Sequence, residues 1–149
     1  MREAIFFGVL ILAGVLWLFF PLLRATYNDY RAKQMIYEME RPYREDAYGG
    51  VTPEATYALF IAALKQGDID LASKYFSPKR QAEWLKNLQQ ISKEKKLPSM
   101  IEDLRRMKPK GSLAKNVFQF DLVNENAEVI LLMTLAQNTF THKWKIESL

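Results

Sequence analysis

Residues 117–148 read VFQFDLVNENAEVILLMTLAQNTFTHKWKIES and decide the fold that the sequence predicts. Phe118, Phe120 and Leu122 alternate with Val117, Gln119 and Asp121, which indicates a half-buried strand. Residues 124–126 predict a turn, residues 128–136 predict a second, more apolar strand, and a third strand is expected at 139–148. The residues expected on one face of that last strand are Phe140, His142, Trp144 and Ile146. The stretch therefore predicts an antiparallel meander.

Four helices are predicted upstream of this meander. Thr52-Pro53-Glu54 combines a capping hydroxyl, a proline at the first helical position and an acid in the first turn, and Gly67 marks the end of that helix. Asp68 can cap a short second helix, and Ser77-Pro78 repeats the start signal for a third. Residues 99–102 have the spacing of a capping box and predict a fourth helix. Helices followed by an antiparallel sheet predict the α+β class, with the helices on one face of the sheet.

The N-terminal run of residues 4–23 contains no charged side chain. About 20 helical residues cross the hydrocarbon core of a bilayer, so we expect residues 1–23 to form a single transmembrane anchor. A cleaved signal peptide is the alternative, but Leu23-Arg24-Ala25 is a poor cleavage site. The basic residues Arg24, Arg31 and Lys33 lean toward a cytoplasmic position for the rest of the chain.

Residues 24–51 are expected to form a stalk and linker. The stretch from Ala25 to Glu40 lacks glycine and proline, which favours a helix that ends near Arg41-Pro42. Five tyrosines occur in this segment, and they could contact lipid headgroups or a partner helix, or pack loosely on the chain's own domain.

Composition excludes several kinds of chemistry. The chain has no cysteine, which excludes disulfides, thiolate zinc sites and thiol catalysis. The net charge of the chain is +4, and residues 1–51 hold six basic and six acidic residues. All of the excess therefore lies in residues 52–149, which hold 15 basic and 11 acidic residues. This excess is too small for a nucleic-acid-binding surface. With one histidine, the sequence predicts no metal, no cofactor and no catalytic residues.

Four short stretches carry a resemblance to a known family. They are Thr52-Pro53-Glu54-Ala55 leading to Phe60, residues 62–68 (AALKQGD), residues 72–77 (ASKYFS) and residues 143–146 (KWKI). On these stretches the domain at 52–149 resembles the NTF2-like superfamily (cystatin-like, SnoaL-type), especially its small bacterial membrane-anchored or secreted members. The resemblance implies helices packed on a curled antiparallel sheet that forms a cone, and a folded domain outside the cytoplasm.

The resemblance and the missing catalytic motifs together favour a noncatalytic accessory domain, tethered to a membrane, that binds a protein or a small ligand in the cavity between sheet and helices. A small isomerase or hydrolase that uses an acid and a tyrosine in the cone is one alternative. An envelope assembly subunit, including a homo-oligomer, is the other.

Two sets of residues are candidates for contact with a partner. Aromatic and polar residues that could line a pocket are Tyr57, Phe60, Trp84, Phe118, Phe120, His142 and Trp144. Basic residues that could contact an anionic surface are Arg105, Arg106, Lys108 and Lys110. Core packing and an ordinary solvated surface are the competing explanations for the two sets.

Overall fold

The computed structural model describes residues 24–149 and separates the chain into two units, Met1–Arg41 and Pro42–Leu149. Residues 24–44 are helical. Their charged side chains include two ion pairs along the helix, Asp29 with Lys33 at 2.7 Å and Glu38 with Arg41 at 3.3 Å.

The predicted fold class began with a transmembrane helix, and the structure corrects it. In the part of the chain that the structure describes, no helix is both long enough and apolar enough to cross a membrane. The helix at 24–44 cannot do so because it carries eight charged residues, each costly in hydrocarbon. They are Arg24, Asp29, Arg31, Lys33, Glu38, Glu40, Arg41 and Arg44. The apolar run at 4–23, on which the expectation rested, lies outside the described residues, and the described fold is α+β with a four-stranded antiparallel sheet.

Between the helix at 24–44 and the sheet lie four helices, as expected, and two of the predicted caps form. The helices are α2 (Pro53–Lys65), α3 (Ile69–Lys74), α4 (Pro78–Lys93) and α5 (Leu97–Arg106). The Thr52 side chain accepts a hydrogen bond from the Ala55 amide, and Asp68 accepts one from Leu71. The capping box predicted at 99–102 is wrong, because α5 already begins at Leu97 without a side-chain cap.

The sheet is an antiparallel meander with strand order β1-β2-β3-β4. Its strands are β1 (Lys108–Ala114), β2 (Val117–Val123), β3 (Val129–Gln137) and β4 (Trp144–Ser148). The meander was predicted, but β1 was not. The expected third strand at 139–148 is shortened to β4, because the Asn138 side chain accepts hydrogen bonds from the amides of Phe140 and Thr141 and holds a turn there.

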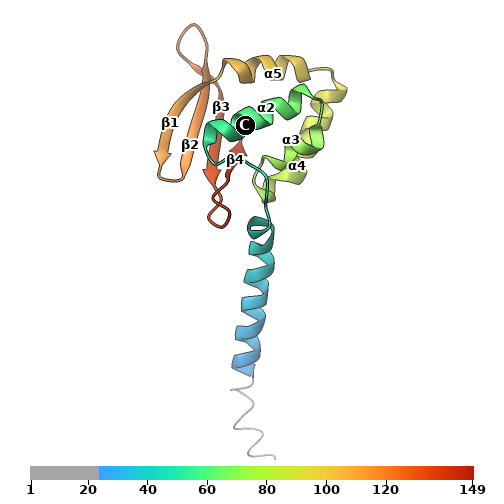
Figure 1. Ribbon diagram of the computed structural model, residues 1–149, viewed down its shortest axis with the longest axis vertical. Coiled ribbons are helices and arrows are strands. Elements are labelled where there is room, and N and C mark those ends of the chain that lie inside the picture. Colours follow the sequence, from blue (N-terminus) through green and yellow to red (C-terminus); the bar gives the residue numbers. More distant parts are fainter. Residues whose placement is uncertain (1–23) are drawn as a thin grey trace, which may run out of the picture. The chain divides into compact units, whose positions relative to one another are not determined.

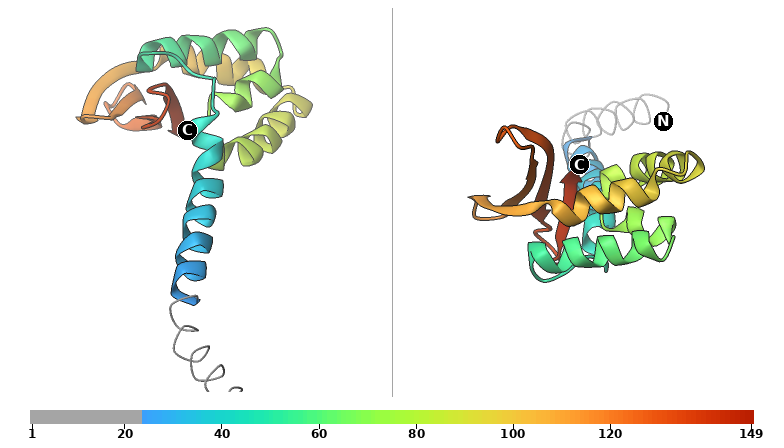
Figure 2. Two further views of the ribbon diagram at one scale, coloured as in Figure 1. Left: turned by 60° about the horizontal axis from the view of Figure 1, so that its bottom comes forward. Right: turned by 90° about the horizontal axis from the view of Figure 1, so that it is seen from above.

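The helices lie to one side of the sheet, and α5 leads directly into β1 (Figures 1 and 2). The core forms where they meet, and the fully buried apolar residues are Phe60, Leu64, Ala72, Phe76, Leu88, Leu104, Met133, Leu135 and Ile146. Phe76 is central, since its ring stacks on Trp84 with centroids 4.4 Å apart and meets Phe60 edge-on at 5.5 Å. The core therefore joins α2, α3 and α4 to the inner face of β3 and β4.

A buried ion pair ties residues 42–51 to β4. Lys145 Nζ lies 2.7 Å from Asp46 Oδ2, and the two side chains are 2% and 3% exposed. The ammonium group also donates to the carbonyl oxygens of Lys74 at 2.6 Å and Tyr48 at 3.2 Å. Burial lowers the pKa of Lys145, and its hydrogen bond to Asp46 opposes that shift. Residues 42–51, the C-terminal part of the predicted stalk and linker, therefore pack on the domain.

Candidate functional site

An open groove of about 500 Å³ runs between α4, α5 and β3. Trp84 and Ile91 come from α4, where a separation of seven residues places both side chains on the same side of the helix. Met100 and Leu104 come from α5, and Leu131 comes from the inner face of β3. The full lining is Trp84, Ile91, Lys96, Ser99, Met100, Asp103, Leu104, Leu131 and Leu149. Apolar side chains therefore form most of the wall.

Trp84 gives this groove a polar feature. Its side chain packs flat on Phe76 and is 9% exposed, yet the buried indole Nε1 has no hydrogen-bond partner within the described residues. A buried donor left unpaired costs about 1–3 kcal/mol, so the site is more stable when an acceptor reaches it. One residue that lines the apolar groove thus carries a buried, unpaired N–H group.

Charged side chains stand at the rim of the groove. Lys96 is exposed and pairs with Glu94 at 2.6 Å, and Asp103 lies 4.0 Å from Arg106. Neither charge is buried without compensation, and no histidine or tyrosine lines the groove. Residues 24–149 also contain no group of three His, Cys, Asp or Glu residues that could hold a metal ion.

The structure distributes the seven predicted pocket residues between the core, the groove and the surface. Phe60 and Phe120 are buried in the core, and Phe118 is half-buried against Phe120. Tyr57 stacks on Phe120 with centroids 4.5 Å apart, and its hydroxyl donates to the Leu104 carbonyl. Burial raises the pKa of Tyr57 to about 12. Phe60 and Phe120 thus belong to the hydrophobic core, and Tyr57 and Phe118 pack against it.

The other three predicted pocket residues separate. Trp84 lines the groove. Trp144 is buried at the start of β4. His142 is exposed and lies in the turn before β4 with a left-handed backbone (φ 56°). Because it is not part of the strand, His142 does not share a strand face with Trp144 as the alternation predicted.

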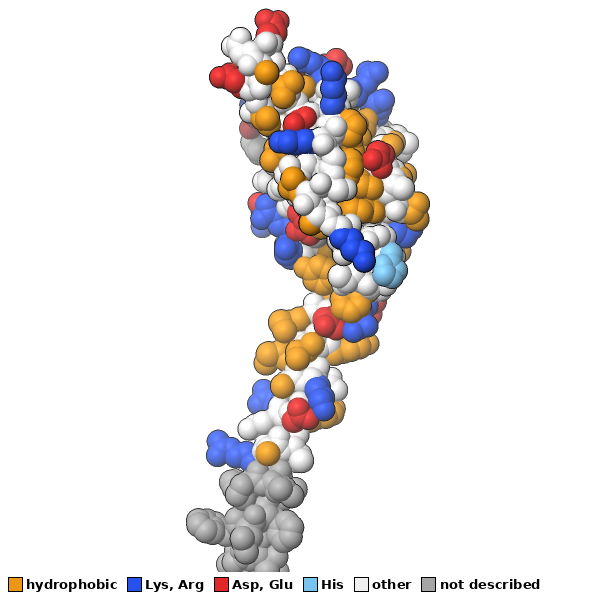
Figure 3. Space-filling view, turned by 90° about the vertical axis from the view of Figure 1, so that its left-hand side faces the viewer, with side chains coloured by type: hydrophobic (Ala, Val, Ile, Leu, Met, Phe, Trp, Pro, Cys, Tyr) orange, Lys and Arg blue, Asp and Glu red, His pale blue; other side chains and the backbone are white. Residues whose placement is uncertain are grey.

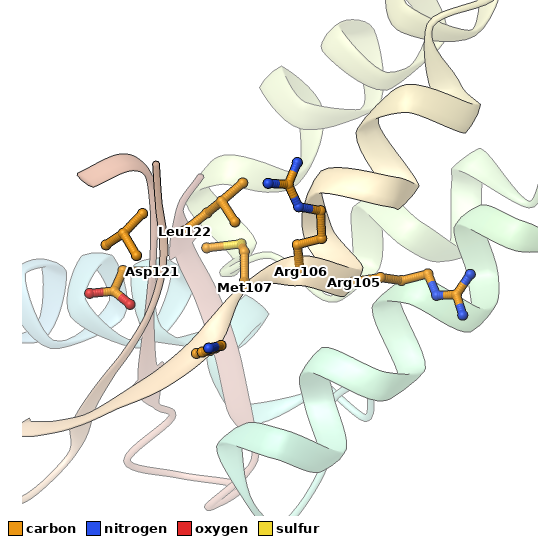
Figure 4. A pocket seen from close by; sticks show the side chains of 7 residues that line it. Arg105, Arg106, Met107, Asp121 and Leu122 are labelled. Atoms are coloured by element: carbon orange, nitrogen blue, oxygen red, sulfur yellow. The ribbon is translucent and has the colours of Figure 1, made fainter. Parts of the chain in front are cut away.

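Three of the predicted basic residues line a second cleft, at the junction of α5 and β1. Its volume is about 470 Å³, and its lining is Arg105, Arg106, Met107, Lys108, Asp121, Leu122 and Val123. The side chains of Arg105 and Arg106 point in different directions, so they do not converge on one anion (Figure 4). The fourth residue, Lys110, lies 3.8 Å from Asp121. Residues 97–128 as a whole hold five basic and five acidic side chains, which leaves this region without net charge.

The outer face of the sheet also exposes apolar side chains. Val129 is 49% exposed, Ile130 is 56% exposed and Leu132 is 38% exposed. Figure 3 shows apolar side chains of this side of the molecule interrupted by charged and polar ones. The α4–α5 groove differs from this surface because it is concave and because Trp84, one of its lining residues, carries an unpaired buried donor.

Fold and groove together define the class of protein as an α+β domain with a helix–sheet groove. Comparisons of the chain with models of protein families, with curated proteins and with solved structures found no match. The resemblance to the NTF2-like superfamily therefore stays a prediction, and so does a location outside the cytoplasm.

Proposed function

We propose that residues 42–149 form a noncatalytic binding domain that takes a small, mainly apolar molecule with a hydrogen-bond acceptor into the α4–α5 groove. The observation that carries this proposal is that Trp84, which lines a groove with apolar walls, has a buried and unpaired indole N–H group. A carbonyl, ether or hydroxyl oxygen on the ligand would supply the missing acceptor.

The size and composition of the groove support this choice. Ligand sites usually measure about 300–1,000 Å³ and are lined by apolar side chains with a few polar groups that fix orientation. The groove measures about 500 Å³ and has this composition. Ile91, Met100 and Leu131 are half-buried, so part of their apolar surface is still available to a ligand.

A pair of probes with and without an acceptor tests the proposal. We would titrate the full chain with 2-decanone, which carries a carbonyl, and with 1-decene, which does not. The indole N–H resonances of the tryptophans would be followed by NMR. The Trp84 resonance is expected to shift with the ketone. One hydrogen bond is worth about 0.5–1.5 kcal/mol, so the ketone should bind about 2–12 times more tightly than the alkene.

Two matched variants identify the donor. Trp84→Phe keeps an aromatic ring against Phe76 but removes the N–H, so the preference for the ketone should disappear. Trp144→Phe is the control, because Trp144 is equally buried (9% exposed) and does not line the groove. Absence of saturable binding by either probe would refute the proposal, as would an unchanged preference in Trp84→Phe.

A further inference from the structure

The excess positive charge of the domain lies on one helix. Residues 79–96, which include most of α4 and the turn after it, hold six basic and two acidic side chains, a net +4. Residues 52–78 hold two basic and three acidic side chains, and residues 97–149 hold seven and six, so these two regions contribute −1 and +1. The sum is the +4 of the whole chain.

Lysines on α4 form a stripe opposite its buried face. Lys79, Lys86 and Lys93 are seven residues apart and all exposed, so they lie along one side of the helix, about 10.5 Å apart at 1.5 Å per residue. Trp84 and Leu88, the buried residues of α4, flank position 86 by two residues on either side and point the opposite way. The helix is therefore amphipathic, with a core face and a basic face.

Several of these lysines have no countercharge on the domain. Lys79 pairs with Glu147 at 3.3 Å, and Lys96 pairs with Glu94. Lys86, Lys93 and Lys95 make no ion pair with any residue from 24 to 149. Between Glu83 and Lys93, Lys86 is the one charged residue among the exposed residues of α4. The basic face is thus open to an external anion.

We propose that this face of α4, defined by Lys79, Lys86 and Lys93, together with Lys95 in the turn after the helix, binds the surface of a bilayer that contains anionic phospholipids. Charge complementarity carries the assignment. Each lysine carries a compact point charge and lacks the planar, two-pronged guanidinium of arginine. A row of such charges therefore suits a bilayer surface, whose charged headgroups can move to meet each lysine, better than it suits a single fixed acidic group. The lysines are exposed, so salt screens their attraction to the lipid and binding should weaken as the ionic strength rises.

A single fluorescent label can report on α4 itself. The chain has no cysteine, so Asn87→Cys, on the exposed side of α4, allows one environment-sensitive dye to be attached to the full chain. Asn126→Cys, in the turn between β2 and β3, gives the matched label elsewhere. Vesicles of phosphatidylcholine alone would be compared with vesicles containing about a third phosphatidylglycerol. The label at 87 is expected to respond to the anionic vesicles alone, and to lose that response in about 0.5 M salt.

Two triple variants of equal charge change locate the contact. Lys86, Lys93 and Lys95 replaced together by glutamine should weaken the response at least about tenfold, since each lysine near a charged bilayer contributes. Arg105, Lys108 and Lys110 replaced together by glutamine should leave it within about twofold. Equal losses in both variants, or equal responses of the two labels, would overturn the proposal. A response to polyglutamate but not to anionic vesicles would overturn it in favour of an acidic protein.

Discussion

Replacing Lys145 with methionine tests whether the buried ion pair holds residues 42–51 on the domain. Methionine keeps most of the length and the apolar stem, but it leaves the Asp46 carboxylate 3% exposed with one hydrogen bond, from the Tyr48 amide at 3.1 Å. Removing one partner of a buried pair costs about 3–5 kcal/mol, because the remaining charge is uncompensated. That loss is a large part of the roughly 5–15 kcal/mol by which domains are stable.

Urea unfolding of the full chain at neutral pH, followed by circular dichroism, measures the effect. With a slope of about 1.5 kcal/mol per M, the midpoint should fall by about 2–3 M. Lys79→Met is the matched control, because it breaks the pair with Glu147 at 3.3 Å, in which the side chains are 63% and 28% exposed. That pair should contribute no more than about 1 kcal/mol.

The double variant Asp46→Leu/Lys145→Met separates the pair from its surroundings. It removes both charges, so it should be less destabilised than Lys145→Met. Together with the single variant Asp46→Leu it completes a cycle that gives the coupling between the two side chains. If Lys145→Met lost no more stability than Lys79→Met, the reasoning would be refuted, since the lysine would then be solvated in the native protein.

Three further substitutions test the packing and the electrostatics. Tyr57 has a pKa raised to about 12, so it stays protonated in the folded state after the unfolded state ionises near 10.0; its contribution to stability is held below pH 10 and lost as the pH rises toward 12. Between pH 10 and pH 12, Tyr57→Phe should therefore lose less stability than the wild type, as measured by urea unfolding at each pH. Gly49→Ala should destabilise more than Gly67→Ala, because both have positive φ but an added Cβ at Gly49 would lie 2.4 Å from a β4 carbonyl, whereas Gly67 has nothing within 4 Å; thermal midpoints check this. Leu135→Ala should cost about 2–5 kcal/mol and Leu132→Ala, on the opposite face of β3, at most about 0.5 kcal/mol by chemical unfolding, and equal costs would contradict the strand register.

The helices were predictable because their signals are local. Thr52 and Asp68 each accept a hydrogen bond from an amide three residues on, which is a contact that spacing alone can predict. The capping box predicted at Ser99 does not form, because the helix that it was expected to start begins two residues earlier. Lys95 adopts a left-handed backbone (φ 57°), the Lys96 amide bonds the Ile91 carbonyl, and the chain enters α5 directly.

Strand β1 was not predictable because its own composition opposes a strand. Lys108-Pro109-Lys110-Gly111 contains residues that are depleted in strands. Pairing with β2 overrides this preference, and irregular register between Pro109 and Gly111 accommodates the proline at the edge of the sheet. Such pairing depends on a neighbour that only the folded chain provides.

The groove and the ion pair could not be predicted because both join distant parts of the chain. The sequence singles out Trp84 as aromatic, but the same pattern singles out Phe60, which is buried completely. The difference arises because α5 and β3 leave a gap beside Trp84, whereas Phe60 is enclosed by its neighbours. Asp46 and Lys145 form an ion pair although nearly the whole sequence of the domain separates them. Neither residue lies in a sequence pattern that indicates a buried charge. A charged residue is buried only where the fold supplies its partner. Residue type and spacing therefore predict the helices and strands, but not which charged side chains are buried. The way in which the helices and strands pack determines which side chains are left available for a ligand.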